Sequence, residues 1–94
     1  MDDPRLKKLR FRAWHRGFRE ADLILGPFAD AHLEQLSLTQ LDAFELLIDQ
    51  PDQDLYGWIT GALATPEPFE GDVLDLIRTF RFFAHTALGA DHGG

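Results

Sequence analysis

Apolar residues recur at spacings of three and four along most of the chain, which is the period of an amphipathic helix. The pattern predicts five helical segments and no convincing strand. Their expected core stripes are Leu6, Leu9 and Ala13; Ala21, Ile24, Phe28 and Ala31; Leu38, Leu41, Phe44, Leu47 and Ile48; Leu55, Trp58, Ile59, Ala62 and Leu63; and Val73, Ile77, Phe80 and Ala84. We therefore expect an all-α fold, a small five-helix bundle that forms a single domain over residues 1–94. Disordered tails are expected over residues 1–4 and 88–94.

The first two segments, residues 5–15 and 18–34, are separated by Gly17. Glycine adopts left-handed backbone angles at little cost, so Gly17 is expected to close the first helix as its C′ residue. Trp14 and Phe18 are apolar and flank this joint, and the pattern predicts that both belong to the core.

The second segment contains the pair Gly26-Pro27. Proline cannot donate to the carbonyl four residues before it, and its ring clashes there. The segment is therefore expected either to kink over residues 23–27 or to restart with Pro27 in a first turn.

A third helix follows a capping-box pattern, in which the Ser37 side chain and that of Gln40 satisfy each other's backbone N–H groups. Thr39 and Asp42 offer an alternative register of the same pattern.

The sequence "DQPDQD" ends the third helix and begins a fourth, with Asp52 or Asp54 as the expected N-cap. The turn-rich stretch "ATPEPFEGD" then leads to a fifth helix, expected over residues 71–87.

The charge is divided unevenly along the chain. Residues 1–20 hold seven basic and three acidic residues, a net of +4, whereas residues 21–94 hold two basic and thirteen acidic residues, a net of −11. The whole domain is expected to repel nucleic acid and anionic membranes, while its N-terminal segment could still dock onto an anionic partner.

The chain lacks the residue patterns of the common enzymes. It has no cysteine, and its four histidines (His15, His32, His85 and His92) do not have the spacing of metal ligands. No glycine-rich phosphate loop or nucleophile elbow is present. No apolar run approaches the roughly 20 residues that span a bilayer, so membrane insertion is not expected. The absence of a targeting segment favours the cytoplasm.

Arg16, Gly17 and Glu20 can be interpreted in two ways. In the first, they are only a helix joint, and an Arg16–Glu20 pair would stabilise one continuous helix by about 0.2–0.5 kcal/mol. In the second, a rigid corner exposes an arginine and a glutamate side by side for a partner. Local pattern alone favours the joint.

The segments "HRGFRE", "AD", "PFAD", "FELLIDQPDQDLYGWITG" and "FEGDVLDLIRTF" appear in this order over about residues 5–82. In order and spacing they resemble the SdhE-type flavinylation factors, the succinate dehydrogenase assembly factor 2 family. The combination of the R-G-x-x-E element with the D-L-Y-x-W segment in a short chain carries the resemblance.

The resemblance implies a five-helix bundle that binds the flavoprotein subunit of succinate dehydrogenase and promotes covalent attachment of FAD to it. Partner contacts would fall on Arg16, Gly17 and Glu20. Arg12, Arg19 and Asp22 flank this element and could extend the contact, although such residues are more often solvated surface charges. The flavin is attached to a histidine of the partner, so this chain would be an assembly factor without catalytic residues, metal or stably bound cofactor. The flavoprotein of fumarate reductase is a second candidate client, and a bacterial cytoplasmic location is implied.

Two other functions remain open at this stage. The basic first helix, with its interleaved aromatic residues, could bind nucleic acid, although the acidic remainder of the chain opposes this. Alternatively, the aromatic stretch "RTFRFFAHTAL" could be the seam of a homodimeric scaffold.

Overall fold

The computed structural model describes residues 3–81 and has helices in all five expected regions. They are α1 (Pro4–Trp14), α2 (Arg19–His32), α3 (Leu38–Ile48), α4 (Asp52–Thr60) and a helical stretch over residues 72–81. Two short 3₁₀ helices, η1 (Leu33–Gln35) and η2 (Glu67–Phe69), lie in the connections. Within the described residues there is no strand, so the prediction of an all-α fold is confirmed.

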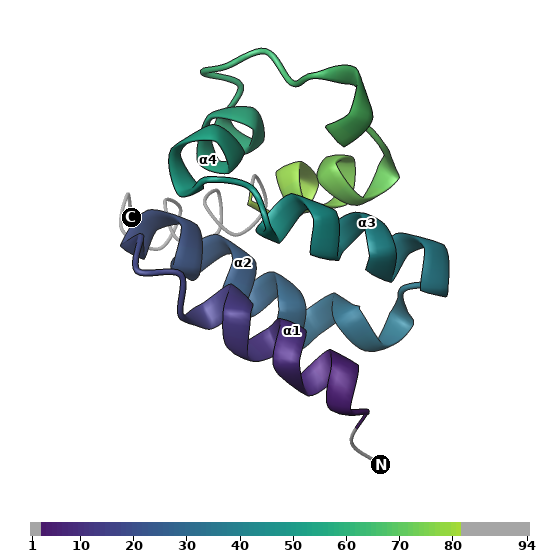
Figure 1. Ribbon diagram of the computed structural model, residues 1–94. Helices are drawn as coiled ribbons and strands as arrows, with labels where there is room; N and C mark the ends of the chain where they lie inside the picture. The colour runs from purple at the N-terminus through teal and green to yellow at the C-terminus, as the bar shows by residue number, and fades with distance from the viewer. Residues whose placement is uncertain (1–2, 82–94) are drawn as a thin grey trace, which may run out of the picture.

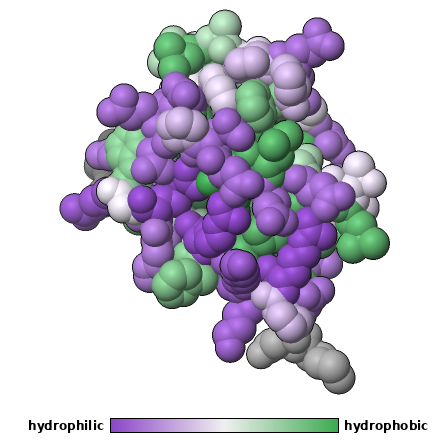
Figure 2. Space-filling view, viewed as in Figure 1, coloured by the Kyte–Doolittle hydropathy of each residue, from purple (hydrophilic) through white to green (hydrophobic). Residues whose placement is uncertain are grey.

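The packing of the helices brings two connections that are far apart in the sequence, α1–α2 and α3–α4, close together in space. α1 and α2 form a hairpin, α3 contacts α1, and α4 contacts both α2 and α3. Figure 1 shows α1 at one side of the molecule and α4 with the following loop at the other, with α2 and α3 between them. In the same view the surface is largely hydrophilic, with smaller apolar areas between the polar side chains (Figure 2).

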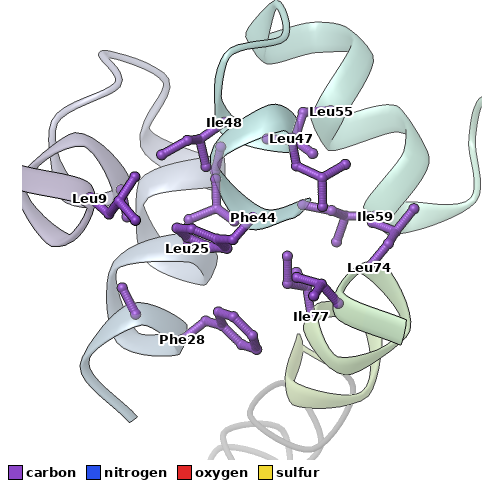
Figure 3. Packing of buried hydrophobic residues seen from close by; sticks show 14 of the residues in the cluster. Leu9, Leu25, Phe28, Phe44, Leu47, Ile48, Leu55, Ile59, Leu74 and Ile77 are labelled. Atoms are coloured by element: carbon purple, nitrogen blue, oxygen red, sulfur yellow. The ribbon is translucent and has the colours of Figure 1, made fainter. Parts of the chain in front are cut away.

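The core contains only apolar side chains among the described residues, and α1 to α4 and the helix over residues 72–81 all contribute to it (Figure 3). Phe28 of α2 and Phe44 of α3 are fully buried, with their rings stacked at a centroid distance of 5.8 Å. Trp58 is buried as predicted and stacks on Phe69 of η2 at 4.8 Å. Full burial of a large apolar side chain contributes about 1.5–3 kcal/mol, so this cluster supplies most of the driving force for folding.

Several positions of the expected stripes lie outside the core. Leu38 is 75% exposed because it is the first residue of α3 and projects beyond the neighbouring helices. Ala31 is also exposed. Ala62 and Leu63 follow the end of α4 and are exposed. Ala84 lies outside the described residues.

α1 begins earlier than expected. Pro4 is its first residue, and the Asp3 side chain caps the helix by accepting a hydrogen bond from the Arg5 backbone N–H at 2.8 Å. Residue 3 is therefore the N-cap and residue 4 the first residue of the helix, and neither belongs to the expected tail. The other expected tail, residues 88–94, lies outside the described residues.

α2 runs without interruption through Gly26 and Pro27, so the predicted restart at Pro27 is wrong. The glycine serves close packing: a Cβ atom there would lie 2.3 Å from the Trp14 ring. Trp14 covers α2 from outside and is 36% exposed, which corrects its assignment to the core. Its indole N–H donates to Asp30 of α2 at 3.2 Å.

The capping box of Ser37 and Gln40 forms as predicted, so the alternative register is not used. The prediction for α4 is wrong: its N-cap is Pro51, without a side-chain cap. Asp52 and Asp54 instead lie in the first turn of α4, where negative charge interacts favourably with the helix dipole.

Candidate partner-binding site

The connection between α1 and α2 is a tight corner formed by Gly17. α1 ends at Trp14 with His15 as C-cap, and Gly17 has a φ of 86°. The predicted left-handed conformation of Gly17 is confirmed, but with His15 as the C-cap Gly17 is the C″ residue and not the expected C′ residue. Any other residue would carry about 1–2 kcal/mol of backbone strain here. A Cβ atom at position 17 would have no atom within 4 Å, so the corner is uncovered.

Arg16 does not project from this corner. Only 8% of its side chain is exposed, and all three guanidinium nitrogens donate to the connection between α3 and α4. Nε lies 2.6 Å from Asp52 Oδ1, Nη2 lies 2.7 Å from the Gln50 carbonyl oxygen, and Nη1 donates to the Ile48 carbonyl. The prediction that Arg16 is exposed is therefore wrong. Its side chain instead links the α1–α2 connection to the α3–α4 connection.

The electrostatics of this position explain why an arginine is stable there. Ile48 is the last residue of α3, so its carbonyl lacks a partner within the helix and lies at the negative end of the helix dipole. Asp52, the first residue of α4, adds a carboxylate. Hydrogen bonds to charged groups contribute about 1.5–3 kcal/mol each. A planar guanidinium can satisfy these divergent acceptors together, whereas a lysine ammonium cannot reproduce its fixed geometry.

Asp22 also stabilises the corner from within. Its Oδ1 accepts a hydrogen bond from the Arg16 backbone N–H at 3.0 Å, which ties the turn to the first turn of α2. Phe18 is half-buried at the N-cap position of α2 and contacts the ring of Tyr56 edge-on, at a centroid distance of 5.2 Å.

Arg19 and Glu20 are the exposed charges of the corner. Both lie in the first turn of α2, and within residues 3–81 neither side chain forms a hydrogen bond or an ion pair. The Arg16–Glu20 pair considered from the sequence is not formed. A partner can reach Arg19 and Glu20 without breaking an internal contact of this part of the chain.

Arg12 forms an ion pair with Asp49, which belongs to the same α3–α4 connection that Arg16 holds. Two hollows open beside these contacts. One, of about 420 Å³, lies between Phe11, Arg12 and His15 on one side and residues 48–52 on the other. The second, of about 470 Å³, lies between Gly17 and Phe18 on one side and residues 51–54 on the other.

The basic N-terminal segment is mostly neutralised by acids of the same chain. Four of its arginines form ion pairs with acids that lie in α2, α3, α4 or the α3–α4 connection. These arginines are Arg5, Arg10, Arg12 and Arg16. The hydrogen bond that Arg5 donates to the Asp42 carboxylate raises the pKa of Arg5. The segment is therefore a weaker attractor of anionic partners than its formal charge suggests, which also weakens the nucleic-acid alternative.

Sequence reasoning missed two bridging contacts. It did not pair Asp52 with Arg16, since the two residues are 36 positions apart. It also missed Arg78, which donates to the Trp58 carbonyl at 3.1 Å and to Thr65 Oγ1 at 2.9 Å. Arg78 is one of only two basic residues after position 20, and that isolation in an acidic stretch was the available signal.

Within residues 3–81 no group of three or more histidine, aspartate or glutamate side chains could hold a metal ion. None of the helices in this range combines the length and the apolar character needed to cross a bilayer. Most of the stretch suggested as a homodimer seam lies outside the described residues.

Comparison with known proteins gives consistent matches. A family model described as flavinator of succinate dehydrogenase matches residues 7–81. The mitochondrial succinate dehydrogenase assembly factor 2 of Dictyostelium discoideum is 42% identical over 72 residues, which cover 77% of this chain and 51% of that protein. The corresponding protein of Danio rerio is 35% identical over 80 residues, covering 83% of this chain and 51% of that protein.

A further relative is the FAD assembly factor SdhE of Acetobacter pasteurianus, 36% identical over 63 residues, covering 67% of this chain and 58% of that protein. The chain spans about half the length of the curated relatives it matches first. The matched range includes the Arg16 corner, the α3–α4 connection and the described part of the last helix. The chain therefore belongs to the family of flavinators of succinate dehydrogenase.

Proposed function

We propose that this chain is an assembly factor that binds the flavoprotein subunit of succinate dehydrogenase and promotes covalent attachment of FAD to it. Membership of the family of flavinators of succinate dehydrogenase and the similarity to assembly factors of that enzyme support this proposal. The proposed site is the corner between α1 and α2. Internal contacts hold this corner in place and leave Gly17, Arg19 and Glu20 exposed within the matched range.

The corner acts by binding and not by catalysis. The factor binds the flavoprotein conformation that holds FAD next to its attachment histidine, and the population shifts by the difference in affinity between conformations. No catalytic residue of this chain takes part, and FAD does not remain bound to it. A rigid bundle suits this role, because a surface that is already ordered loses less entropy on binding.

The residues predicted for partner contact divide into two groups. Gly17, Arg19 and Glu20 meet the flavoprotein directly, since they are exposed. The side chains of Arg12 and Asp22 contribute through the internal contacts that shape this surface. The flavoprotein of fumarate reductase is a second client, and the bacterial cytoplasm remains our expectation for the location.

The proposal is tested in cells that lack their own factor and express the flavoprotein subunit. The wild-type chain is expected to restore covalent flavin, seen as fluorescence of the denatured subunit after electrophoresis. Glu20→Ala is expected to abolish the restoration, whereas Glu67→Ala, another exposed acid in a first helical turn, retains it. Absence of restored fluorescence with the wild-type chain would contradict the proposed function, and normal fluorescence with Glu20→Ala would contradict the site.

A further inference from the structure

The orientation of Arg16 suggests a division of labour within the corner. We propose that Arg16 is a positioning residue for partner binding, which acts through Asp52 and the α3–α4 connection and does not itself contact the flavoprotein. The inference rests on the proposed function, because it concerns how the same surface is made ready for that partner.

Arg16 offers a partner little access. Its Nε, Nη1 and Nη2 atoms each donate to a different internal acceptor, and only 8% of the side chain is exposed. The second N–H of each Nη belongs to this covered side chain, so a bidentate contact with a carboxylate of the partner would have to displace Asp52 or one of the two carbonyls. Because charge-assisted hydrogen bonds are strong, such an exchange would gain little affinity.

The two connections that Arg16 joins are far apart along the chain. Arg16 and Asp52 are separated by 36 positions, and α2 and α3 lie between them. Arg16 is therefore a direct cross-link between the corner and the start of α4. Its backbone N–H, bound to Asp22, extends this link to the first turn of α2, where Glu20 lies.

The cross-link defines the shape of a surface to which both connections contribute. The hollow of about 470 Å³ has Gly17 and Phe18 on one side and residues 51–54 on the other. Gln53 and Asp54 are exposed at the start of α4, across this hollow from the corner. Without the Arg16–Asp52 contact the two sides would be held less firmly, since the edge-on contact of Phe18 with Tyr56 would remain as the side-chain contact between the corner and α4, and a partner that touches both sides would have to order them further on binding.

A positioning role and a direct contact predict different results. If Arg16 met an acidic group of the partner, its removal would reduce the dependence of association on salt. If Arg16 acts by positioning, removal of Asp52 weakens binding as well, although Asp52 carries the opposite charge. In that case the double variant is hardly worse than Arg16→Ala alone, because Arg16→Ala already removes the contact with Asp52.

The experiment measures the affinity of the purified flavoprotein subunit for the full chain and its variants, at a temperature where circular dichroism shows each variant to be folded. Arg16→Ala and Asp52→Ala are each expected to weaken binding roughly tenfold, and the double variant by less than about threefold more. Asp42→Ala is the matched control, since it removes an acid that pairs with an arginine of α1, Arg5, at the end of that helix away from the corner. It is expected to weaken binding by less than about threefold.

Hydrogen exchange of the free chain provides a second measurement. Asp52→Ala is expected to accelerate exchange at the backbone amide of Arg16, whereas Asp42→Ala leaves it unchanged. Wild-type affinity for Asp52→Ala together with lost binding for Arg16→Ala would overturn the positioning role, as would fully additive effects in the double variant. Failure of the wild-type chain to bind the flavoprotein would instead overturn the proposed function.

Discussion

Two corners within residues 3–81 can be compared. Each contains a left-handed glycine, and in each an arginine side chain links neighbouring segments. Gly17 follows Arg16 directly with a φ of 86°, and Gly61 follows α4 with a φ of 84°. A Cβ atom would meet nothing within 4 Å at either glycine. In the second corner, Arg78 donates to the Trp58 carbonyl and to Thr65, so that it bridges the end of α4 and the following loop.

The two arginines differ in how far their side chains are buried and in the charged residues beside them. The Arg16 side chain is 8% exposed, whereas that of Arg78 is 32% exposed and also contacts Glu70 and Asp75. Near Arg16, the acid Glu20 stays exposed without an internal partner among the described residues. The same left-handed glycine therefore occurs in both corners, but the first also has exposed charges of both signs, Arg19 and Glu20, within three residues of the glycine.

The largest difference is expected when each left-handed glycine is replaced by arginine. Gly17→Arg and Gly61→Arg carry the same backbone strain, about 1–2 kcal/mol, and neither creates a steric clash at Cβ. Gly17→Arg is expected to weaken flavoprotein binding by roughly a hundredfold, because a long side chain would occupy the contact centre. Gly61→Arg leaves binding within about threefold of wild type.

Calorimetric titration of the purified flavoprotein subunit measures this difference, and thermal unfolding of the two variants checks that they have lost similar stability. Equal loss of affinity in both variants would show that the strained backbone, and not the location of the corner, determines binding.

The next comparison concerns the two arginines themselves. Arg16→Ala is expected to lower the free energy of unfolding by about 2–3 kcal/mol, because it removes charge-assisted hydrogen bonds from a largely buried position. Arg78→Ala is expected to cost about 1 kcal/mol, since its ion pairs are more exposed and screened by solvent. Urea unfolding measures both values. A larger loss for Arg78→Ala would mean that exposure is not what distinguishes the two bridges.

A smaller effect is expected at two helical glycines that each receive a neighbouring side chain. A Cβ atom at Gly26 would lie 2.3 Å from the Trp14 ring, and one at Gly57 would lie 2.5 Å from a methyl group of Leu63. Gly26→Ala is expected to cost about 1–2 kcal/mol, because the rigid indole must move away from α2. Gly57→Ala is expected to cost less than about 1 kcal/mol, since the exposed Leu63 can swing aside and alanine favours the helix.

Urea unfolding of these two alanine variants provides the comparison, with the indole fluorescence of the Gly26 variant as a check on Trp14. If Gly26→Ala proved neutral, close packing of Trp14 on α2 would not be needed to hold the end of α1 before the corner.

The fold was largely predictable because the apolar period and the capping box are local signals. Ser37 and Gln40 lie three residues apart and satisfy each other directly, so the start of α3 could be predicted from the sequence. The position of a residue within a helix does not reveal whether another part of the chain packs over it. For this reason Leu38 was wrongly predicted to lie in the core. Trp14 was misplaced for a related reason: its contact with Gly26 is a property of two helices.

The candidate site was only partly predictable. The left-handed Gly17 follows from its lack of a side chain, and the exposed Glu20 agrees with its polar position in a first turn. The burial of Arg16 could not be inferred, because two of its acceptors are backbone carbonyls that carry no mark in the sequence. Asp52 was expected to cap α4, and its carboxylate instead pairs with a residue 36 positions away.

The most direct test of the account is site-specific crosslinking in cells that contain the flavoprotein subunit. A photoreactive amino acid replaces Arg19, which is exposed beside Glu20, or replaces Glu67 in the opposite connection as a control. We expect a covalent adduct with the succinate dehydrogenase flavoprotein from position 19 and none from position 67. An adduct from position 67 but not from position 19 would contradict the claim that the Arg16 corner is the surface that binds the partner.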